Sequence, residues 1–344
     1  MGDKINLVNG NIITMDSSCP KAESISIDSG KIAGINSIDH NFGTLDLKGA
    51  TVIPGFVDSH FHLVNLGKQK DTLNLRLCTS AQEIADLVLR KSKELNDKDW
   101  IFGFGWDHTK WEESKYPSNH ILNNLNIKQP VMLTRIDGHS CWVNNHAMHL
   151  SGLNVSIEAP EGGNIINNCI LIDNAMNPVQ FIIPKPSEEK VKRWIKLALD
   201  IIIPRGITNI HDAWQDPTTV KVLKKMVDNN ELPIRVYGML GSSYSKLLKE
   251  TFKSGHYQSG NYTIRAAKAF IDGALGSRGA ALLSPYSDDK NNCGLILISN
   301  QQFEDLAQLC KENKIQLCTH AIGDKGNRMV LDVYSKTNKN IKNH

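Results

Sequence analysis

The sequence lacks an apolar run long enough to cross a membrane. No stretch approaches the roughly 18 apolar residues of a transmembrane helix. The N-terminal residues MGDKINLVNGNIITMD are interrupted by polar side chains, so they lack the unbroken apolar segment of a secretory signal. CxxC pairs are also missing, and the odd number of cysteines, seven, fits reduced thiols rather than a disulfide framework. We therefore expect a cytoplasmic protein without a membrane partner.

The sequence also lacks an excess of charge of either sign. Its 344 residues include 39 Lys and Arg and 36 Asp and Glu, a formal net charge of +3. Basic blocks and a repeated aromatic–basic pattern are absent, so we do not expect a nucleic-acid partner. The composition, with 40% hydrophobic and 22% charged residues, is that of an ordinary globular protein. It does not decide between a monomer and a homo-oligomer.

Two turn signals mark the first 50 residues. Asn9-Gly10 stands between the apolar runs of INLVNGNIITM, and Ser29-Gly30 stands between those of SISIDSGKIAGI. Both dipeptides favour a tight hairpin. A unit of this size buries too little apolar surface to be stable alone. We expect a small β unit that packs on a larger domain.

From Thr51 the pattern changes to buried strands that alternate with helices. TVIPGFVDSHFH is a near-continuous apolar run, as in a strand buried on both faces. Ser80 and Ser299 begin capping-box patterns, and Ser187 can cap a third helix that stops before Gly206. Further runs of the strand type are PVMLTRI, GITNIHDA, PIRVYGML, TIRAAKAFID and KIQLCTHAI. The alternation predicts an α/β fold with a parallel sheet.

Residues at about 100–185 do not follow this alternation. They are rich in Trp, Asn and Gly, and we interpret them as an insertion between barrel units. Within it, Trp106-Asp107, Trp142 and Asp137-Gly138-His139 can line a pocket, as can Trp214 further along the chain. Aromatic side chains serve more often in plain packing.

Two histidines stand one residue apart near the end of the first buried run, in Asp58-Ser59-His60-Phe61-His62. Alternate residues of a strand point to the same side, so His60 and His62 can face one centre. Paired imidazoles suit a metal ion, and the active sites of barrels lie at the C-terminal ends of strands. A bare HxH is more often two unrelated histidines, but the preceding PGFVDS turn favours a metal site.

Lys268 lies within the apolar stretch 264–271. A buried lysine has a lowered pKa, and its neutral amine can react with carbon dioxide to give a carbamate that bridges metal ions. The alternative, which the residues alone favour, is an edge-strand lysine whose ammonium reaches water. His211 and His320 also stand at strand ends. A lone histidine there is more often structural, but a barrel brings several such residues to one pocket.

Seven blocks of sequence together resemble one family. They are LVNGNIITMD…AESISIDSGKIAGI, VIPGFVDSHFH, GFGWDHTKW, RIDGHSCWVNNHAM, GITNIHDAW, KAFIDGALGSRGAALLSPYSD and THAIGDKGN. They resemble the amidohydrolase superfamily, and within it the amidohydrolase-3 branch, which includes N-substituted formamide deformylase-like enzymes. The resemblance runs from about residue 4 to the last residues.

The resemblance implies a small β-sandwich, made of N- and C-terminal segments, beside a metal-bearing (β/α)8 TIM barrel. Residues 1–50 would be the N-terminal part of the sandwich, and residues 51–344 a barrel domain with the insertion described above.

The resemblance also implies the metal ligands. His60 and His62 match the ligand pair of the first strand, and His320 matches the fifth-strand ligand. Lys268 matches the fourth-strand lysine, which bridges metals in relatives when it is carboxylated.

The family pattern continues with a sixth-strand histidine and an eighth-strand aspartate that have no counterpart in this sequence. About five barrel strands are present, so we expect an incomplete, C-terminally truncated barrel. Because an open sheet exposes strand edges, the isolated chain is expected to be unstable or inactive.

The implied function is hydrolysis of a non-peptide C–N bond in a small-molecule amide or formamide. A divalent ion polarises the carbonyl group and lowers the pKa of a bound water towards about 7. Zinc is the preferred ion for imidazole ligands, with iron, manganese and nickel as alternatives. His211 and His139 are weaker candidates for substrate or oxyanion contacts. Two alternatives stay open: a non-catalytic family member that binds metal or ligand, and a truncated, non-functional product.

Overall fold

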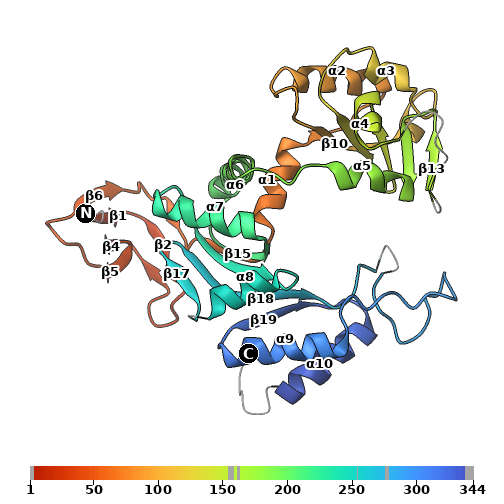
Figure 1. The fold of residues 1–344 in the computed structure, drawn as a ribbon. Helices are drawn as coiled ribbons and strands as arrows, with labels where there is room; N and C mark the ends of the chain where they lie inside the picture. The colour runs from red at the N-terminus through yellow and green to blue at the C-terminus, as the bar shows by residue number, and fades with distance from the viewer. Residues whose placement is uncertain (1–3, 154–158, 161–162, 254, 276–278, 338–344) are drawn as a thin grey trace.

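Figure 1 shows the fold in the computed structural model, which describes residues 4–153, 159–160, 163–253, 255–275 and 279–337. The chain forms a pair of small N-terminal sheets, a sheet of parallel strands covered by helices, and a second, mixed sheet. No helix in the described residues is both long and apolar enough to cross a bilayer.

The N-terminal residues form two small sheets around the side chains of Ile12, Ala22 and Ile25. One sheet has the order β5-β4-β1-β6, with β1 (Ile5–Val8), β4 (Ile25–Asp28), β5 (Lys31–Ile35) and β6 (Gly43–Asp46). The other has the order β3-β2-β7, with β2 (Asn11–Ile13), β3 (Lys21–Ala22) and β7 (Thr51–Val52).

The two predicted hairpin turns have different outcomes. Ser29 and Gly30, both at positive φ, join the antiparallel strands β4 and β5 as predicted. The hairpin predicted at Asn9-Gly10 is wrong, because β1 and β2 do not pair with each other. Asn9 does have a positive φ, but the turn carries the chain from one sheet to the other. Strand β1 pairs instead with β4 and β6, which offer it longer ladders than the three-residue β2.

The parallel sheet has five parallel strands, in the order β8-β15-β16-β18-β19 along the chain and in space. Short strand β17 (Tyr257–Ser259) adds antiparallel to β18. The five strands are β8 (Phe56–Phe61), β15 (Ile207–Gln215), β16 (Arg235–Gly241), β18 (Tyr262–Phe270) and β19 (Gln316–His320). The helices of this part are α1 (Leu63–Asp71), α6 (Glu188–Ile202), α7 (Pro217–Asp228), α8 (Ser245–Phe252), α9 (Asn300–Glu312) and α10 (Asp324–Thr337).

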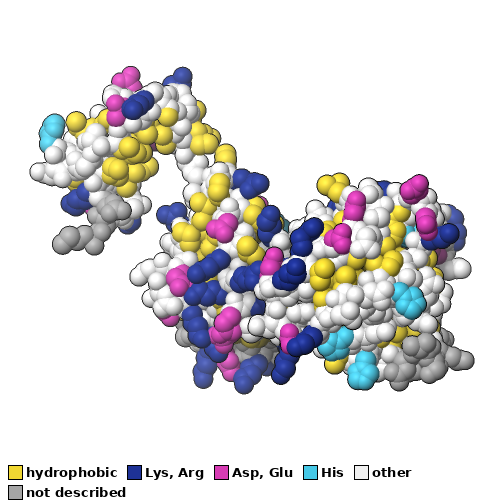
Figure 2. Space-filling model, turned by 90° about the horizontal axis from the view of Figure 1, so that it is seen from above, with side chains coloured by type: hydrophobic (Ala, Val, Ile, Leu, Met, Phe, Trp, Pro, Cys, Tyr) yellow, Lys and Arg dark blue, Asp and Glu magenta, His cyan; other side chains and the backbone are white. Residues whose placement is uncertain are grey.

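The two faces of this sheet differ. The helix-covered face contributes to the largest hydrophobic core, which includes Ile210, Tyr262 and Phe303. On the other face, Ala213, Met239 and Ala266 form a small separate cluster, as expected for the interior of a barrel. Away from the sheet, Lys221 and Lys225 of α7 both pair with one glutamate of α6. Figure 2 shows that acidic and basic side chains are intermingled on the viewed face of the molecule.

Helix ends follow the sequence signals. Ser299 and Gln302 form a complete capping box at α9, and Ser187 accepts a hydrogen bond from the backbone N–H of Lys190 at α6. Ser80 accepts from the N–H of Glu83, but the Glu83 carboxylate bonds to the N–H of Thr79 rather than that of Ser80.

One glycine allows two helices to cross in close contact. A Cβ on Gly67 of α1 would lie 1.8 Å from the carbonyl oxygen of Trp194 on α6, so only glycine lets these two helices approach this closely.

The mixed sheet has the order β13-β14-β12-β11-β10-β9 and its own hydrophobic clusters. Figure 1 shows it as a separate body, joined to the parallel sheet through α1 and the segment between α5 and α6. Its strands are β9 (Leu73–Asn74), β10 (Ile101–Trp106), β11 (Val131–Arg135), β12 (Ser140–Val143), β13 (Gly163–Ile166) and β14 (Ile170–Asp173). Its helices are α2 (Ala81–Ser92), α3 (Asn119–Asn123), α4 (Asn145–Leu150) and α5 (Asn177–Ile182).

This sheet begins at Leu73, earlier than the boundary at about residue 100 that the sequence suggested, and it includes the run PVMLTRI as β11. The physical reason is that β9, β10 and β11 are parallel and α2 follows a capping signal. The same strand–helix pattern therefore serves both sheets, and periodicity alone does not separate them.

Candidate metal centre

His60 and His62 stand at the C-terminal end of β8, where the strand runs into α1. His60 is exposed and His62 is half-buried, and their ring centroids are 5.4 Å apart. Burial lowers the pKa of His62, and the nearby His60 and Lys268 lower it further. His62 is thereby held as a neutral imidazole, the form that binds a metal ion.

Lys268 is buried, with only 5% of its surface exposed. It lies on β18, which has β16 on one side and β19 on the other, so the alternative of an edge-strand lysine whose ammonium reaches water is wrong. Burial lowers the pKa of Lys268. In the described part of the chain it forms no ion pair, and its Nζ lies 5.5 Å from the centroid of the Phe270 ring.

His320 is the last residue of β19 and is opposite Phe270 in the parallel register. Because side chains alternate along a strand, Lys268, Phe270 and His320 share one side of the sheet. The His320 ring lies 5.0 Å from the ring of Phe270, and its Nε2 lies 4.0 Å from Oδ1 of Asp272.

His211 is on β15, half-buried, with its ring 4.9 Å from that of Tyr237 on β16. It alternates with Ala213, which packs against Ala266 in the interior cluster. Ala266 in turn alternates with Lys268 on β18. His211 therefore faces the same interior as Lys268.

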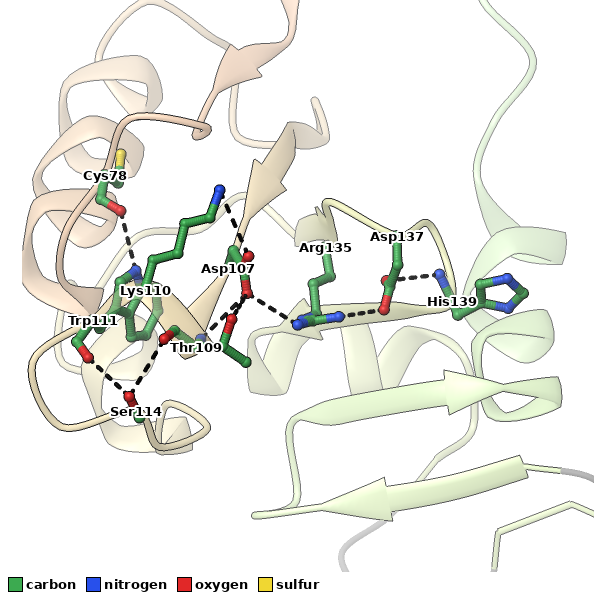
Figure 3. Close-up of polar contacts among 9 residues, drawn as sticks. All are labelled: Cys78, Asp107, Thr109, Lys110, Trp111, Ser114, Arg135, Asp137 and His139. Carbon is green, nitrogen blue, oxygen red and sulfur yellow. Dashed lines mark hydrogen bonds and ion pairs between the residues drawn. The ribbon is translucent and has the colours of Figure 1, made fainter. Parts of the chain in front are cut away.

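The sixth candidate, His139, lies in the other sheet, between β11 and β12. Figure 3 shows its surroundings, in which Arg135 forms ion pairs with both Asp107 and Asp137. The backbone N–H of His139 donates to Oδ1 of Asp137 at 3.1 Å, and its Nδ1 lies 3.0 Å from Oδ1 of Asp173. His139 is thus at the edge of a charged cluster, away from the strands that carry the other candidates.

The three tryptophans considered as pocket residues lie in two different sheets. Trp106 and Trp142 are fully buried in the core of the mixed sheet and serve packing there. Trp214 is half-buried at the end of β15, where its ring lies 5.2 Å from that of Phe270.

Two buried aspartates at the same strand ends were not among the predicted site residues. Asp212 follows His211 and Asp272 follows β18, and both are at most 1% exposed. Burial raises the pKa of Asp212 to about 6. The available signal was an acidic residue directly after an apolar strand, in GITNIHDA and TIRAAKAFID.

The donor set can be tested against a metal ion. Among the residues that the structure describes, no three His, Cys, Asp or Glu side chains are grouped closely enough to hold an ion. What the chain offers is a pair of imidazoles at one strand end, with a buried amine that interacts electrostatically with His62. Nitrogen donors of this kind fit a zinc-type ion as part of a ligand set.

Relatives by sequence point to one family. The model of the amidohydrolase family matches residues 43–344. The chain is 30% identical over 357 residues to Protein LONG AFTER FAR-RED 3 of Arabidopsis thaliana, covering 95% of this chain and 60% of that protein. It is 28% identical over 347 residues to the putative amidohydrolase YtcJ of Bacillus subtilis, covering 95% and 65%. N-substituted formamide deformylase of Arthrobacter pascens is 22% identical over 353 residues, covering 95% and 65%. The chain therefore spans 60–65% of the length of these curated relatives.

Solved structures agree with this assignment. An uncharacterized metal-dependent hydrolase from Pyrococcus horikoshii OT3 matches with a TM-score of 0.81 and 26% identity, over 97% of this chain and 68% of that one. A second, from Pyrococcus furiosus, matches with a TM-score of 0.81 and 25% identity, over 97% and 70%. The α/β fold is thus that of the metal-dependent TIM-barrel hydrolases, and this chain belongs to the amidohydrolase family.

Proposed function

We propose that the whole protein is a metal-dependent amidohydrolase that cleaves a non-peptide C–N bond in a small amide or formamide. The observation that carries the proposal is the meeting of His60, His62 and Lys268 at the C-terminal ends of parallel strands, with the pKa of both His62 and Lys268 lowered. A neutral imidazole binds a metal ion, and the active sites of barrels lie at this end of the strands.

His60, His62, Lys268 and His320 are the proposed metal ligands. In the described residues His60 and His62 lie together, but no three such donors are grouped closely enough to hold an ion, so binding would also need donors from the rest of the protein. The ion supplies a polarised substrate carbonyl and a bound water of lowered pKa. Zinc suits the imidazole donors best, and iron, manganese and nickel suit them nearly as well. Because Lys268 is buried and its pKa is lowered, its amine can add to carbon dioxide, losing one proton and giving a carbamate whose oxygens are metal ligands.

For the substrate contact we favour His211 over His139. His211 faces the same interior as Lys268, whereas His139 lies on the mixed sheet beside Asp173. A half-buried imidazole in that position can donate a hydrogen bond to the substrate carbonyl oxygen as negative charge develops on it.

The remaining donors and the carboxylate that moves the proton to the leaving amine would come from further barrel strands of the whole protein. Two observations support this part of the proposal. The chain spans 60–65% of the length of its curated relatives. Within the described residues, β8 and β19 each pair on one side only, so each offers an edge to another strand.

The test is to load the protein with zinc, iron, manganese or nickel in turn and to assay a panel of amides and formamides, with the matching esters for comparison. Metal content is measured on the same samples. Turnover of amides that is lost on chelation and restored by the metal is the expected result. Stoichiometric metal without turnover on any substrate would instead favour a non-catalytic binding protein.

A further inference from the structure

Two carboxylates are buried at the C-terminal ends of the parallel strands without being candidate ligands. Asp212 is 1% exposed and Asp272 is fully buried. A buried carboxylate is costly unless hydrogen-bond donors surround it. In both cases backbone N–H groups of a neighbouring strand end are among the donors.

Asp212 connects the end of β8 to the middle of the sheet. Its Oδ1 accepts the backbone N–H of Leu63, the residue directly after His62, at 2.9 Å. Its Oδ2 accepts from Nε2 of Gln215 at 2.9 Å, and Oε1 of Gln215 accepts the hydroxyl of Tyr262 at 2.5 Å. The network thus runs from β8 through β15 to the start of β18.

Strand β16 lies between β15 and β18. Its Gly238 leaves room for the Gln215 side chain to reach Tyr262. A Cβ at Gly238 would lie 2.3 Å from Oε1 of Gln215. Any other residue at this position would displace the amide that links Asp212 to Tyr262. The backbone of β16 therefore accommodates this polar connection.

Asp272 binds the backbone that follows β19, as Asp212 binds the backbone that follows β8. Its Oδ1 accepts the N–H of Ile322 at 2.9 Å, and its Oδ2 accepts the N–H of Gly323 at 2.7 Å and that of Ala281 at 2.9 Å. Ile322 and Gly323 are the second and third residues after His320. A Cβ at Gly326 would lie 2.8 Å from Oδ2, so glycine there leaves room for the carboxylate.

We propose that Asp212 and Asp272 are positioning residues that hold the two outer ligand-bearing strand ends in register with Lys268. Asp212 fixes His62 through the N–H of Leu63, and Asp272 fixes His320 through the turn that follows it. The proposal rests on the proposed metal centre. Groups outside the ligand set that orient the ligands commonly change metal affinity about 10- to 100-fold when they are removed.

The experiment compares Asp212→Asn and Asp272→Asn with Ser187→Ala in the full chain. Each asparagine keeps the size of the side chain but replaces one of its two accepting oxygens with an N–H₂ donor, so at least one of the present N–H groups loses its acceptor. Ser187→Ala removes the cap of α6 and so weakens the fold without touching either strand end. Zinc affinity is measured by competition with a chromophoric chelator, and thermal melting of each variant reports that it is folded.

We expect both asparagine variants to bind zinc about 10- to 100-fold more weakly and Ser187→Ala to bind like the wild type. Zinc affinity equal to the wild type in folded asparagine variants would overturn the positioning role.

A second measurement does not depend on metal. Amide hydrogen exchange of the metal-free chain should accelerate around residues 60–66 in Asp212→Asn and around residues 320–324 in Asp272→Asn, each variant leaving the other strand end unchanged. An acceleration spread evenly over the chain, or none at these ends, would overturn the proposal. If the wild type binds no zinc, the proposed function fails, and the exchange pattern still decides whether the two aspartates hold the strand ends.

Discussion

The two sheets of this molecule both carry charged or ionisable groups at strand ends, but the groups are arranged in opposite ways. In the mixed sheet, Arg135 forms ion pairs with Asp107 and Asp137, and Lys110 also pairs with Asp107, so two positive charges balance two negative ones (Figure 3). In the parallel sheet, His60, His62 and Lys268 can all carry a positive charge. Burial lowers the pKa of His62, and the nearby His60 and Lys268 lower it further.

The difference separates a structural cluster from a binding site. Opposite charges in contact satisfy each other and leave little capacity for a ligand. Basic groups gathered at one strand end, by contrast, disfavour one another's charged forms, and a neutral imidazole has a lone pair for a metal ion. We therefore assign the metal centre to the parallel sheet. The predictions below test this assignment and the independence of the two sheets.

The largest expected effect is on the stability of the mixed sheet. Trp142 is fully buried in its core, and Trp142→Ala should cost about 3–5 kcal/mol of the free energy of unfolding. Region-resolved hydrogen exchange during denaturant unfolding measures it. The loss should fall on the strands of the mixed sheet, β9 to β14, while the parallel strands keep their protection. Equal loss of protection in both sheets would mean that they unfold as one unit.

Zinc binding should depend on one sheet only. His62→Ala removes an imidazole donor and should weaken zinc binding by at least about 100-fold, more than the loss of an orienting group. His139→Ala is the matched control, because it removes a histidine from the mixed sheet. Isothermal titration of both variants is the measurement. A comparable loss in His139→Ala would contradict the assignment of the centre to the parallel sheet.

The free energy of unfolding should decrease as the pH rises, because Asp212 loses its proton. Burial raises its pKa to about 6 in the folded chain from an ordinary value of 3.8, so the folded state binds this proton more tightly than the unfolded state. The resulting stabilisation is present in full below the unfolded pKa and is lost as the pH rises through about 6. The change is on the order of 2–3 kcal/mol, at 1.36 kcal/mol per pKa unit.

The measurement for Asp212 is the free energy of unfolding of the wild type and Asp212→Asn between pH 4 and pH 7. The variant has no carboxyl group at this position, so the difference between the two proteins should change across this window. Parallel pH profiles would show that Asp212 keeps its ordinary pKa in the folded chain.

The smallest losses of the free energy of unfolding are expected at two helix caps, one beside each sheet. Ser299→Ala at α9 and Ser80→Ala at α2 should each cost about 1 kcal/mol. Ser299 forms a complete capping box and Ser80 does not, so the first substitution should cost slightly more. Hydrogen exchange near each helix would show whether the loss stays within its own sheet.

Local signals in the sequence predicted much of the fold. Ser29-Gly30 forms its hairpin, because both residues adopt the positive φ that the turn requires. Ser187 and Ser299 cap their helices, because a hydroxyl close to free backbone N–H groups acts over three residues. Membership of the amidohydrolase family was also predicted from the sequence blocks.

Strand pairings between residues distant in sequence were predicted wrongly or had no signal in the sequence. Asn9-Gly10 turns the chain but joins no hairpin, because the partners of β1 come from residues 25–28 and 43–46. The run PVMLTRI has the composition of a barrel strand but pairs within the mixed sheet.

The sequence by itself determined the turns, the caps, the strands of the parallel sheet and the candidate donors at their ends, because these depend on residues a few positions apart. The expectation that β8 is buried on both faces is wrong, since Phe56 and Val57 are more than half exposed. Only the tertiary structure decided that Lys268 is buried between two strands and that His139 lies on another sheet. It also decided that Asp212 holds the N–H of Leu63, 149 residues away in the chain. Burial and long-range hydrogen bonds depend on which strands become neighbours, and that is settled by packing rather than by local pattern.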